Sequence, residues 1–363
     1  MAGRLLAALA AVGALLAHWW LSSAPAITIV GNVTIDIVDG KRVLGGAVSY
    51  AAAVAAAWGQ RACIVAAAAD DAPLGSTFEG HDLVIVPSSQ TLVFEHTYTF
   101  WGNHRKLRVP AQPNVTLGWQ HVPARCHRAR TLLLGPLMPE DLDPASFLPG
   151  AHPRPWWERA LGLAPRQQQL VGLMAQGLQR RLEGGGQVKQ LRQPSGQLEQ
   201  ALGPSTLVFL SDVETEVWRN GTVEGLAART RAFLVTRGGE GADEYLGAAR
   251  RHHPVFAVDR VVDTNGAGDT FATAYMLAAA AGHSSPISVA HWAGGLAVSQ
   301  PQACKPACVT DALRASWRSM PPSSSASSWA AVQRVLLPPA RLLAQVLRHG
   351  AGAGVGSPAA QAA

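Results

Sequence analysis

The sequence is poor in cysteine, with four in 363 residues. Cys63 and Cys126 stand alone, and three residues separate Cys304 from Cys308, with no second Cys or His pair to accompany them. A structural zinc site needs two such pairs, so this spacing argues against a zinc-binding module. We therefore expect free thiols in a reducing compartment.

Charged residues are also scarce, at 15% of the chain, whereas 48% of the residues are hydrophobic. A chain of this length and composition can bury one sizeable α/β core. The net charge of +6 comes from scattered arginines, and no aromatic residues interleave with them in a basic stripe. The composition therefore argues against nucleic-acid binding and against disorder of the chain as a whole.

Acidic residues are absent from residues 1–25, where an apolar run covers residues 5–21. This pattern is typical of a signal peptide or a short membrane anchor. The run is short for a membrane span, and a predicted core strand begins directly after it, so an organellar targeting segment and a wrongly assigned start stay open. Membrane contact is expected only if this segment is retained. At the other end, residues 317–363 form a Ser/Pro/Ala-rich tail.

The strongest signal is Val-Val-Asp-Thr-Asn-Gly-Ala-Gly-Asp-Thr-Phe-Ala at residues 261–272. It predicts an apolar strand, a small-residue turn and an alanine-rich helix, which is the layout of a phosphate cradle. A helix start has unpaired N–H groups and a partial positive charge, and the small side chains of residues 266–268 let an oxyanion approach it. Asp269, on the first turn, can then accept a proton from a hydroxyl that attacks the phosphate.

Elsewhere, apolar runs alternate with helix-forming segments. Buried strands are predicted within residues 27–37, 132–137, 207–210 and 232–236, and a helix is predicted from Gly46 to Gly59. Residues 91–101 and 105–109 alternate like the arms of a β-hairpin. Residues 170–182 have a sequence pattern that resembles a helix, whereas residues 150–155 and 184–196 resemble surface loops.

The string from Asp263 to Phe271 closely resembles the C-terminal signature of the PfkB/ribokinase family of small-molecule kinases, usually Asp-Thr-x-Gly-Ala-Gly-Asp-x-Phe. The resemblance covers roughly residues 27–313. It implies a ribokinase-like three-layer α/β sandwich with a small β-sheet lid. The kinase domain would occupy residues 26–316, with a lid hairpin at about 88–112 and low-complexity insertions at about 150–204.

The resemblance also implies roles for individual residues. Asp269 is the expected catalytic base, and Glu214 is expected to order Mg²⁺ indirectly, through water. The residues expected to form the anion hole and to bind ATP are Gly266, Ala267, Gly268, Asp263, Thr264, Thr236, Gly238 and Gly241. Those expected to bind the substrate are Asp36, Gly45, Gly46 and Asn32. Without the family, Ser211 and Glu214 predict a helix N-terminal capping box, which is compatible with the same role.

Two positions depart from the family pattern. Tyr50 stands where ribokinase-like members have a sugar-binding Asn, and Ser211 replaces the Asn of an Asn-x-x-Glu motif. The segment Val-x-x-x-Ala-Gln-Gly-x-x-Arg, ending at Arg180, is similar to one in plant-type inositol kinases. Together these features favour myo-inositol as the acceptor over ribose, fructose or adenosine.

The resemblance thus implies a kinase that transfers the γ-phosphate of ATP, with Mg²⁺, to a hydroxyl of a sugar or polyol. We expect it to act as a monomer or a lid-mediated dimer, in the cytoplasm or a plastid. The departures at Tyr50 and Ser211 keep a catalytically inactive interaction or regulatory protein open. A membrane-anchored nucleotide sensor depends only on the apolar run of residues 5–21.

Overall fold

The structure, a computed structural model, describes residues 24–38, 40–98, 105–148, 151, 169–316 and 319–320. The apolar run at residues 5–21 and most of the predicted tail lie outside these residues. Within the part that is described, no helix is both long and apolar enough to cross a membrane.

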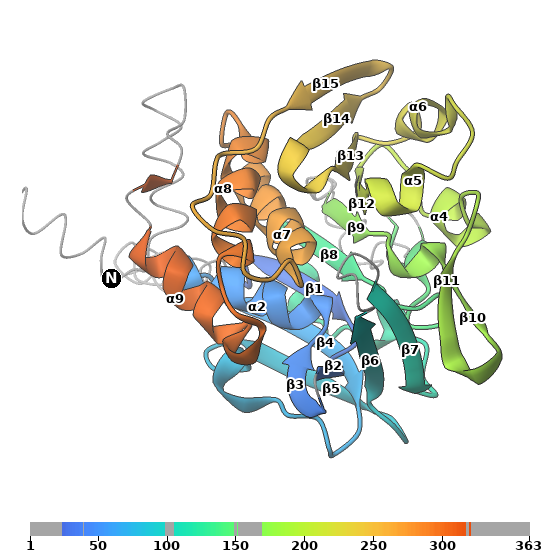
Figure 1. Cartoon of the computed structure of the whole chain (residues 1–363), viewed down its shortest axis with the longest axis vertical. Helices are drawn as coiled ribbons and strands as arrows, with labels where there is room; N and C mark the ends of the chain where they lie inside the picture. Colours follow the sequence, from blue (N-terminus) through green and yellow to red (C-terminus); the bar gives the residue numbers. More distant parts are fainter. Residues whose placement is uncertain are drawn as a thin grey trace, which may run out of the picture.

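The main sheet has nine strands and runs through the centre of the molecule (Figure 1). In spatial order they are β15 (Ala249–His253), β14 (Ala242–Leu246), β13 (Ala232–Thr236), β12 (Thr206–Ser211), β9 (Leu170–Met174), β8 (Thr131–Gly135), β1 (Ile27–Gly31), β4 (Ala62–Ala68) and β5 (Asp82–Pro87). From β5 to β13 all neighbours are parallel, and β14 and β15 complete one edge as antiparallel strands.

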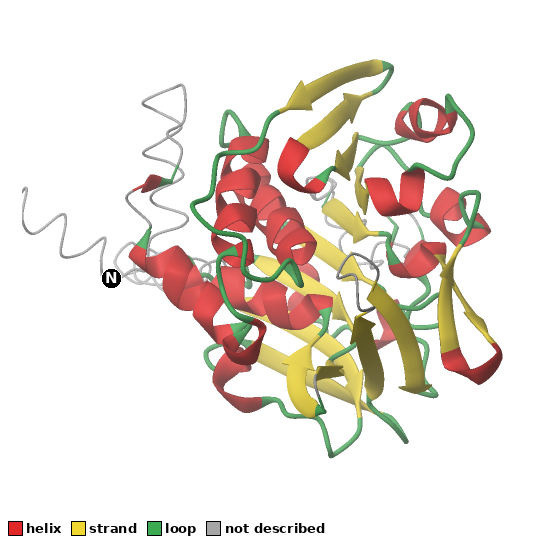
Figure 2. Cartoon of the chain, viewed as in Figure 1, coloured by secondary structure: helices red, strands yellow, loops and turns green. Residues whose placement is uncertain are grey.

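Helices cover both faces of this sheet (Figure 2). One face packs against α2 (Ala47–Ala57) and α7 (Ala267–Ala280), and α8 (Pro286–Val298) and α9 (Ala307–Ala315) pack against these two helices. The other packs against α4 (Gly196–Gln200) and α6 (Thr222–Ala227), with α5 (Asp212–Thr215) following β12. Because side chains alternate along a strand, Ile29 and Leu133 enter the first core while Val30 and Leu134 enter the second. The predicted three-layer sandwich is confirmed.

Short 3-10 helices lie in the connections. They are η1 (Gly75–Phe78), η2 (Trp119–His121), η3 (Cys126–Arg128), η4 (Pro144–Phe147), η5 (Gly177–Gln179), η6 (Gly184–Gly186), η7 (Gly238–Glu240) and η8 (Gln302–Cys304).

A second sheet of six strands stands beside the ends of the first. Its order is β10 (Arg180–Glu183), β11 (Gln187–Gln190), β7 (Arg105–Ala111), β6 (Leu92–Tyr98), β2 (Thr34–Val38) and β3 (Lys41–Gly45). β6 and β7 pair antiparallel, with Tyr98 opposite Arg105, so the predicted hairpin is confirmed. β2 follows β1 after two residues, which carries the chain from the core sheet into this second sheet.

The helical interpretation of residues 170–182 is wrong. Leu170–Met174 is β9, inserted between β8 and β12, and it is followed by η5 and β10. A short apolar run fits a buried strand or a buried helix equally well, because periodicity does not separate them. The expected loop at 184–196 includes β11, so residues 169–204 hold regular structure rather than only insertions.

The strand expected before the phosphate cradle is also absent from the described fold: residues 254–265 contain no regular element. The side chains of Val261 and Val262 are 60% and 40% exposed, so this apolar pair is not part of a core strand. Instead, the N–H groups of Val262 and Asp263 donate to the carbonyl oxygen of Val298 at the end of α8.

The expectation of free thiols is wrong as well. Cys63 on β4 forms a disulfide with Cys126, and Cys304 forms one with Cys308 on α9. The first pair is buried in the core, 63 residues apart in sequence, so its spacing gave no sign of the pairing. The inference of a reducing compartment, which depended on free thiols, loses its basis.

Candidate active site

The phosphate-cradle segment forms a tight loop at the start of α7. Gly266 is the N-cap residue, with a φ of 75°, and a side chain added there would collide with the ring of Tyr50 on α2. This position therefore needs glycine for both its conformation and its space. α7 has 14 residues, so its first-turn N–H groups and its dipole are directed at the space beside Asp269.

One cavity of about 830 Å³ lies at this helix start. Its volume is within the range of small-molecule sites. Among the predicted residues, the lining includes Asp269, Gly266, Ala267, Gly268, Asp263, Thr264, Thr236, Gly238, Gly241, Asp36 and Gly46. These residues come from β2, the start of α2, the turn after β13 and the start of α7, so the fold brings distant parts of the prediction together.

Asp269 is placed for proton transfer at the middle of this set. The pKa of its carboxyl is raised to about 6, chiefly by burial; the positive charge of Arg180 lowers it and the negative charge of Asp36 raises it. Gln176 Nε2 lies 3.4 Å from Asp269 Oδ1. At neutral pH the carboxylate predominates, so Asp269 can act as a base with a pKa close to the working pH.

Gln176 and Arg180 were not among the predicted site residues, although both line the cavity. Arg180 is buried, donates to the carbonyl oxygen of Leu137 at 2.9 Å and lies 3.3 Å from Gln176 Oε1. Its guanidinium also sits 5.8 Å from the centre of the Phe94 ring. The Gln-Gly-x-x-Arg spacing was visible in the sequence, but the expected helix gave no reason to place it here.

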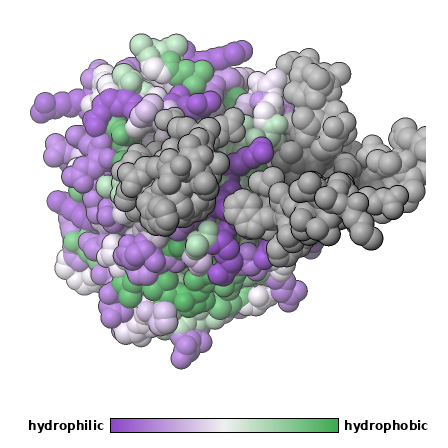
Figure 3. Space-filling model, turned by 180° about the vertical axis from the view of Figure 1, so that it is seen from behind, coloured by the Kyte–Doolittle hydropathy of each residue, from purple (hydrophilic) through white to green (hydrophobic). Residues whose placement is uncertain are grey.

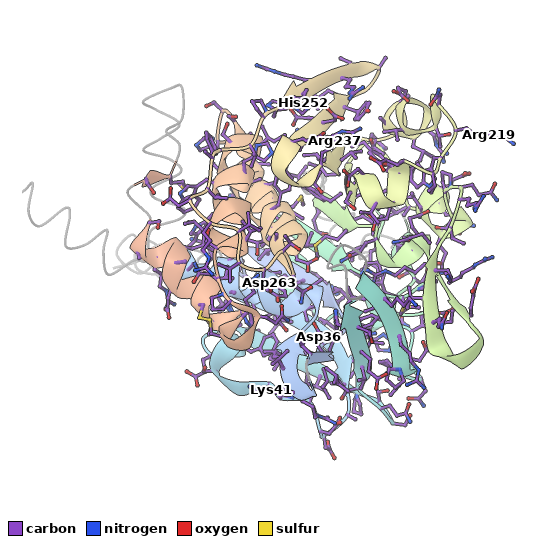
Figure 4. The ribbon with its side chains drawn as sticks, in the orientation of Figure 1. Asp36, Lys41, Arg219, Arg237, His252 and Asp263 are labelled. Atoms are coloured by element: carbon purple, nitrogen blue, oxygen red, sulfur yellow. A yellow bond between two sulfur atoms is a disulfide. The ribbon has the colours of Figure 1, made fainter. Side chains whose placement is uncertain are left out.

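The part of the cavity where we expect the acceptor to bind, called the acceptor side below, centres on Asp36. Its Oδ1 accepts from Thr34 Oγ1 at 2.8 Å, and its Oδ2 accepts from Asn265 Nδ2 at 3.3 Å. His96 Nε2 lies 3.7 Å from the same Oδ2, with its side chain 5% exposed. Figure 4 shows Asp36 and Asp263 near the centre of the molecule, contributed by β2 and by the loop before α7. The contact through Asn265 joins the acceptor side to the phosphate loop.

The other predicted acceptor residues differ in position. Gly46 caps α2 with a φ of 92° and lines the cavity. Gly45 lies beside Asp36, where an added Cβ would stand 2.5 Å from Asp36 Oδ2. Asn32 is fully buried, interacts with Asp141 and is not among the lining residues. Gly45 and Asn32 therefore do not line the cavity. Gly45 packs against Asp36, which does line it, and Asn32 interacts with the buried Asp141.

Asp141 is a buried residue that the sequence did not single out. Its Oδ2 accepts from the N–H groups of Leu137 and Met138, both at 2.8 Å. Burial raises its pKa to about 6, against the stabilising effect of those bonds and of Asn32. It fixes the turn whose Leu137 carbonyl receives Arg180.

The part of the cavity where we expect the phosphate donor to bind, called the donor side below, extends from the turn after β13 to α8. Gly241 has a φ of 113°, and a Cβ there would overlap the carbonyl of His253, so the turn of residues 237–241 requires glycine at that position. Small residues of α8, Gly294 and Gly295, and residues 255–258 form the far wall. Arg237, at the start of this turn, and His252 on β15 both contact the buried carboxylate of Asp243.

Glu214 does not line the cavity. Its Oε2 accepts from the N–H of Ser211 at 2.8 Å and from Ser211 Oγ at 2.5 Å, and its Oε1 accepts from Gln190 Nε2 at 3.3 Å. The capping box predicted from sequence is confirmed. The neighbouring Ser211 and Asp212 do line the cavity. Among the described residues, no three His, Cys, Asp or Glu side chains cluster as metal ligands.

The residues that line the cavity fit Mg²⁺ only if the ion is bound mainly by substrate phosphates and water. Such an ion keeps several waters and uses one or two carboxylates together with the substrate phosphates. Asp212 is a cavity-lining residue whose carboxylate could contribute one ligand, whereas Glu214 accepts from Ser211 and does not line the cavity.

Comparisons with known proteins agree with this geometry. Residues 173–309 match the model of the pfkB family carbohydrate kinases. No curated protein matches the chain.

Solved structures match over most of the chain at low identity. A pyrophosphate-dependent kinase of the ribokinase family, solved with a pyrophosphate analogue and myo-inositol, has a TM-score of 0.56 and 16% identity, covering 76% of this chain and 96% of its own. Adenosine kinase from Sinorhizobium meliloti has a TM-score of 0.56 and 18% identity, covering 81% and 99%. Arabidopsis thaliana ribokinase with ribose and ATP has a TM-score of 0.52 and 17% identity, covering 86% and 99%.

The family match covers the cradle, Asp269 and the turn after β13. Residues 173–309 are thus similar to the pfkB family carbohydrate kinases, and the chain has a ribokinase-like fold.

Proposed function

We propose that this protein is a kinase that transfers the γ-phosphate of ATP to a hydroxyl of a sugar or polyol, with myo-inositol as the first acceptor to test. The observation that carries the proposal is the position of Asp269. Its carboxylate stands on the first turn of α7, between the glycine-lined donor side and the Asp36 side of one cavity.

In the proposed reaction, the acceptor hydroxyl is held by Asp36 and faces Asp269. Asp269 takes the proton as the acceptor oxygen bonds to the γ-phosphorus and the bond from that phosphorus to the leaving ADP breaks. The backbone N–H groups at the start of α7 stabilise the charge that develops on the transferred phosphoryl oxygens. Magnesium, when bound, would neutralise phosphate charge from the Asp212 side. Direct in-line transfer requires no phosphorylated enzyme.

A polyol acceptor is supported by the polar groups around Asp36. His96, Gln176 and Arg180 face the same part of the cavity, so several hydroxyls of one ring can find partners. Tyr50 occupies the cavity wall at the position where an Asn would be expected for ribose. A structural neighbour is described with myo-inositol, which places that compound first in the test.

The part of the cavity that lies next to α8, beyond the expected phosphate site, supports ATP as the donor. Gly294, Gly295 and Val298 on α8 leave the donor side lined by small side chains, where a base can enter. Because the same neighbour is described as pyrophosphate-dependent, pyrophosphate belongs in the donor panel.

The test is product formation by the full chain from Mg·ATP or Mg·pyrophosphate with inositol, ribose, fructose or adenosine. Asp269→Asn should abolish it, whereas Asp259→Asn, at an exposed carboxylate outside the cavity, should leave it unchanged. If folded wild-type protein binds ATP but phosphorylates none of these acceptors, the alternative of a non-catalytic regulatory protein is favoured instead.

A further inference from the structure

A lysine outside the cavity reaches the back of the phosphate loop. Lys305 lies between η8 and α9, and its side chain is 0% exposed. Its Nζ is 2.7 Å from the carbonyl oxygen of Asp263, 2.9 Å from the carbonyl oxygen of Asn265 and 3.1 Å from Asp263 Oδ2. An ammonium has three N–H donors, so each donor has one acceptor in this loop.

These contacts fix the direction of two peptide groups. In a planar trans peptide, the C=O and the following N–H point in opposite directions. The carbonyls of Asp263 and Asn265 both point to Lys305, so the N–H groups of Thr264 and Gly266 point away from it. Thr264 and Gly266 line the cavity, whereas Lys305 does not.

The lysine itself is held from both sides. Cys304 and Cys308 are joined by a disulfide, and α9 is tied to α2 by the bond from Thr310 Oγ1 to the carbonyl of Ala53 at 3.2 Å. Burial lowers the pKa of Lys305, and the neighbouring Asp263 carboxylate raises it. The ammonium of Lys305 is thus paired with the Asp263 carboxylate inside the loop.

We propose that Lys305 is a positioning residue: its buried ammonium serves as an internal monovalent cation that aims the phosphate-loop amides at the phosphoryl group. The inference rests on the proposed phosphoryl transfer for its effect on rate. A positive charge bound to two carbonyls also polarises their peptide groups, which strengthens the N–H donors on the cavity side.

The first variant is Lys305→Met, which keeps a side chain of similar length and removes the charge. We expect kcat to fall by about 100-fold, the scale for loss of one oxyanion-stabilising donor, with a smaller change in the acceptor KM. Lys41→Met is the matched control, because Lys41 is exposed on β3 at the edge of the molecule (Figure 4). A folded Lys305→Met enzyme with wild-type kcat would overturn the inference.

The second variant, Lys305→Ala, separates a cation role from mere packing. Truncation leaves room beside the same three oxygens, which are ligands suited to a small hard cation. Ammonium or potassium chloride should raise its melting temperature and restore part of kcat, relative to tetramethylammonium chloride at equal ionic strength. Lys305→Met and wild type should not respond, because a side chain fills the space.

The melting measurement does not depend on turnover. If wild type phosphorylates no acceptor, the proposed function fails, while the cation response of Lys305→Ala still decides this inference. If that variant folds and shows the same melting temperature in all three salts, the oxygens do not form a cation site and the inference is wrong.

Discussion

At the scale of single residues, the proposed phosphoryl transfer depends most on the ionisation of Asp269. Its environment raises the pKa to about 6, and only the deprotonated form can accept a proton. We expect kcat/KM to rise with pH through an acid limb near 6 and to level off above it. Melting temperatures across the same range are needed as a control, because burial also raises the pKa of Asp141 to about 6. A limb near the ordinary value for aspartate would contradict the assignment.

Arg180 is the residue that should move this limb. Its positive charge lowers the pKa of Asp269, so Arg180→Gln should shift the limb to higher pH. We also expect kcat to fall by about 100-fold, because the cavity loses the positive charge that acts on Asp269. Arg181→Gln is the matched control, since Arg181 is exposed and forms a surface ion pair with Glu183. An unmoved limb in the Arg180 variant would mean that the two groups do not interact.

Sequence reasoning at this scale succeeded where the chemistry is contiguous. Gly266 and Asp269 lie within one short string, so their relation could be predicted. Gln176 and Asp269 are 93 residues apart, and Lys305 is 42 residues from Asp263, and nothing in local periodicity links such pairs. Only the folded sheet brings them together.

At the scale of elements, the loop into α7 is the feature to test. Gly266→Ala should lower the free energy of unfolding by about 2 kcal/mol, because the left-handed backbone and the ring of Tyr50 both exclude a side chain. Gly268→Ala has open space around the new Cβ, so its stability should match wild type while the donor KM rises. Denaturant melts and donor titrations measure the two effects. A Gly268→Ala enzyme with an unchanged donor KM would show that phosphate does not approach this residue.

Helices and strands could be predicted where the residue pattern fits only one kind of secondary structure. The helix from Ala47 to Ala57 and the β6–β7 hairpin have unambiguous patterns, and both are confirmed. β9 has the composition of a helix segment, and its identity as a strand depends on its insertion between β8 and β12. Val261 and Val262 have high strand propensity, but the structure pairs their segment with the end of α8 instead.

At the scale of the whole molecule, the layer order could be predicted because strands and helices alternate along the chain. The spatial order of the strands could not, because it depends on crossovers such as the one that places β1 between β8 and β4. Seen from behind, the surface is largely hydrophilic, with hydrophobic side chains gathered toward its lower part (Figure 3). The buried cysteines also belong to this scale, since their pairing joins segments distant in sequence.

The Cys63–Cys126 disulfide should stabilise the domain as a whole. A cross-link between residues 63 positions apart is worth about 4 kcal/mol in the chain-entropy model. We expect the double variant Cys63→Ala and Cys126→Ala to unfold at clearly lower urea concentration. The Cys304–Cys308 disulfide closes a loop of only a few residues. The double variant Cys304→Ser and Cys308→Ser should therefore lower the free energy of unfolding by less. Four titratable thiols in the denatured, unreduced protein would show that neither bond forms.

The central claim is that one cavity carries out phosphoryl transfer with Asp269 as its base. The most direct measurement is the appearance of phosphorylated acceptor, followed by ³¹P NMR, from Mg·ATP and myo-inositol with the full chain and with Asp269→Asn. We predict that the wild-type protein forms a phosphate monoester and that the Asp269→Asn variant does not, although the variant still binds ATP. The same product at an equal rate from both proteins would contradict it.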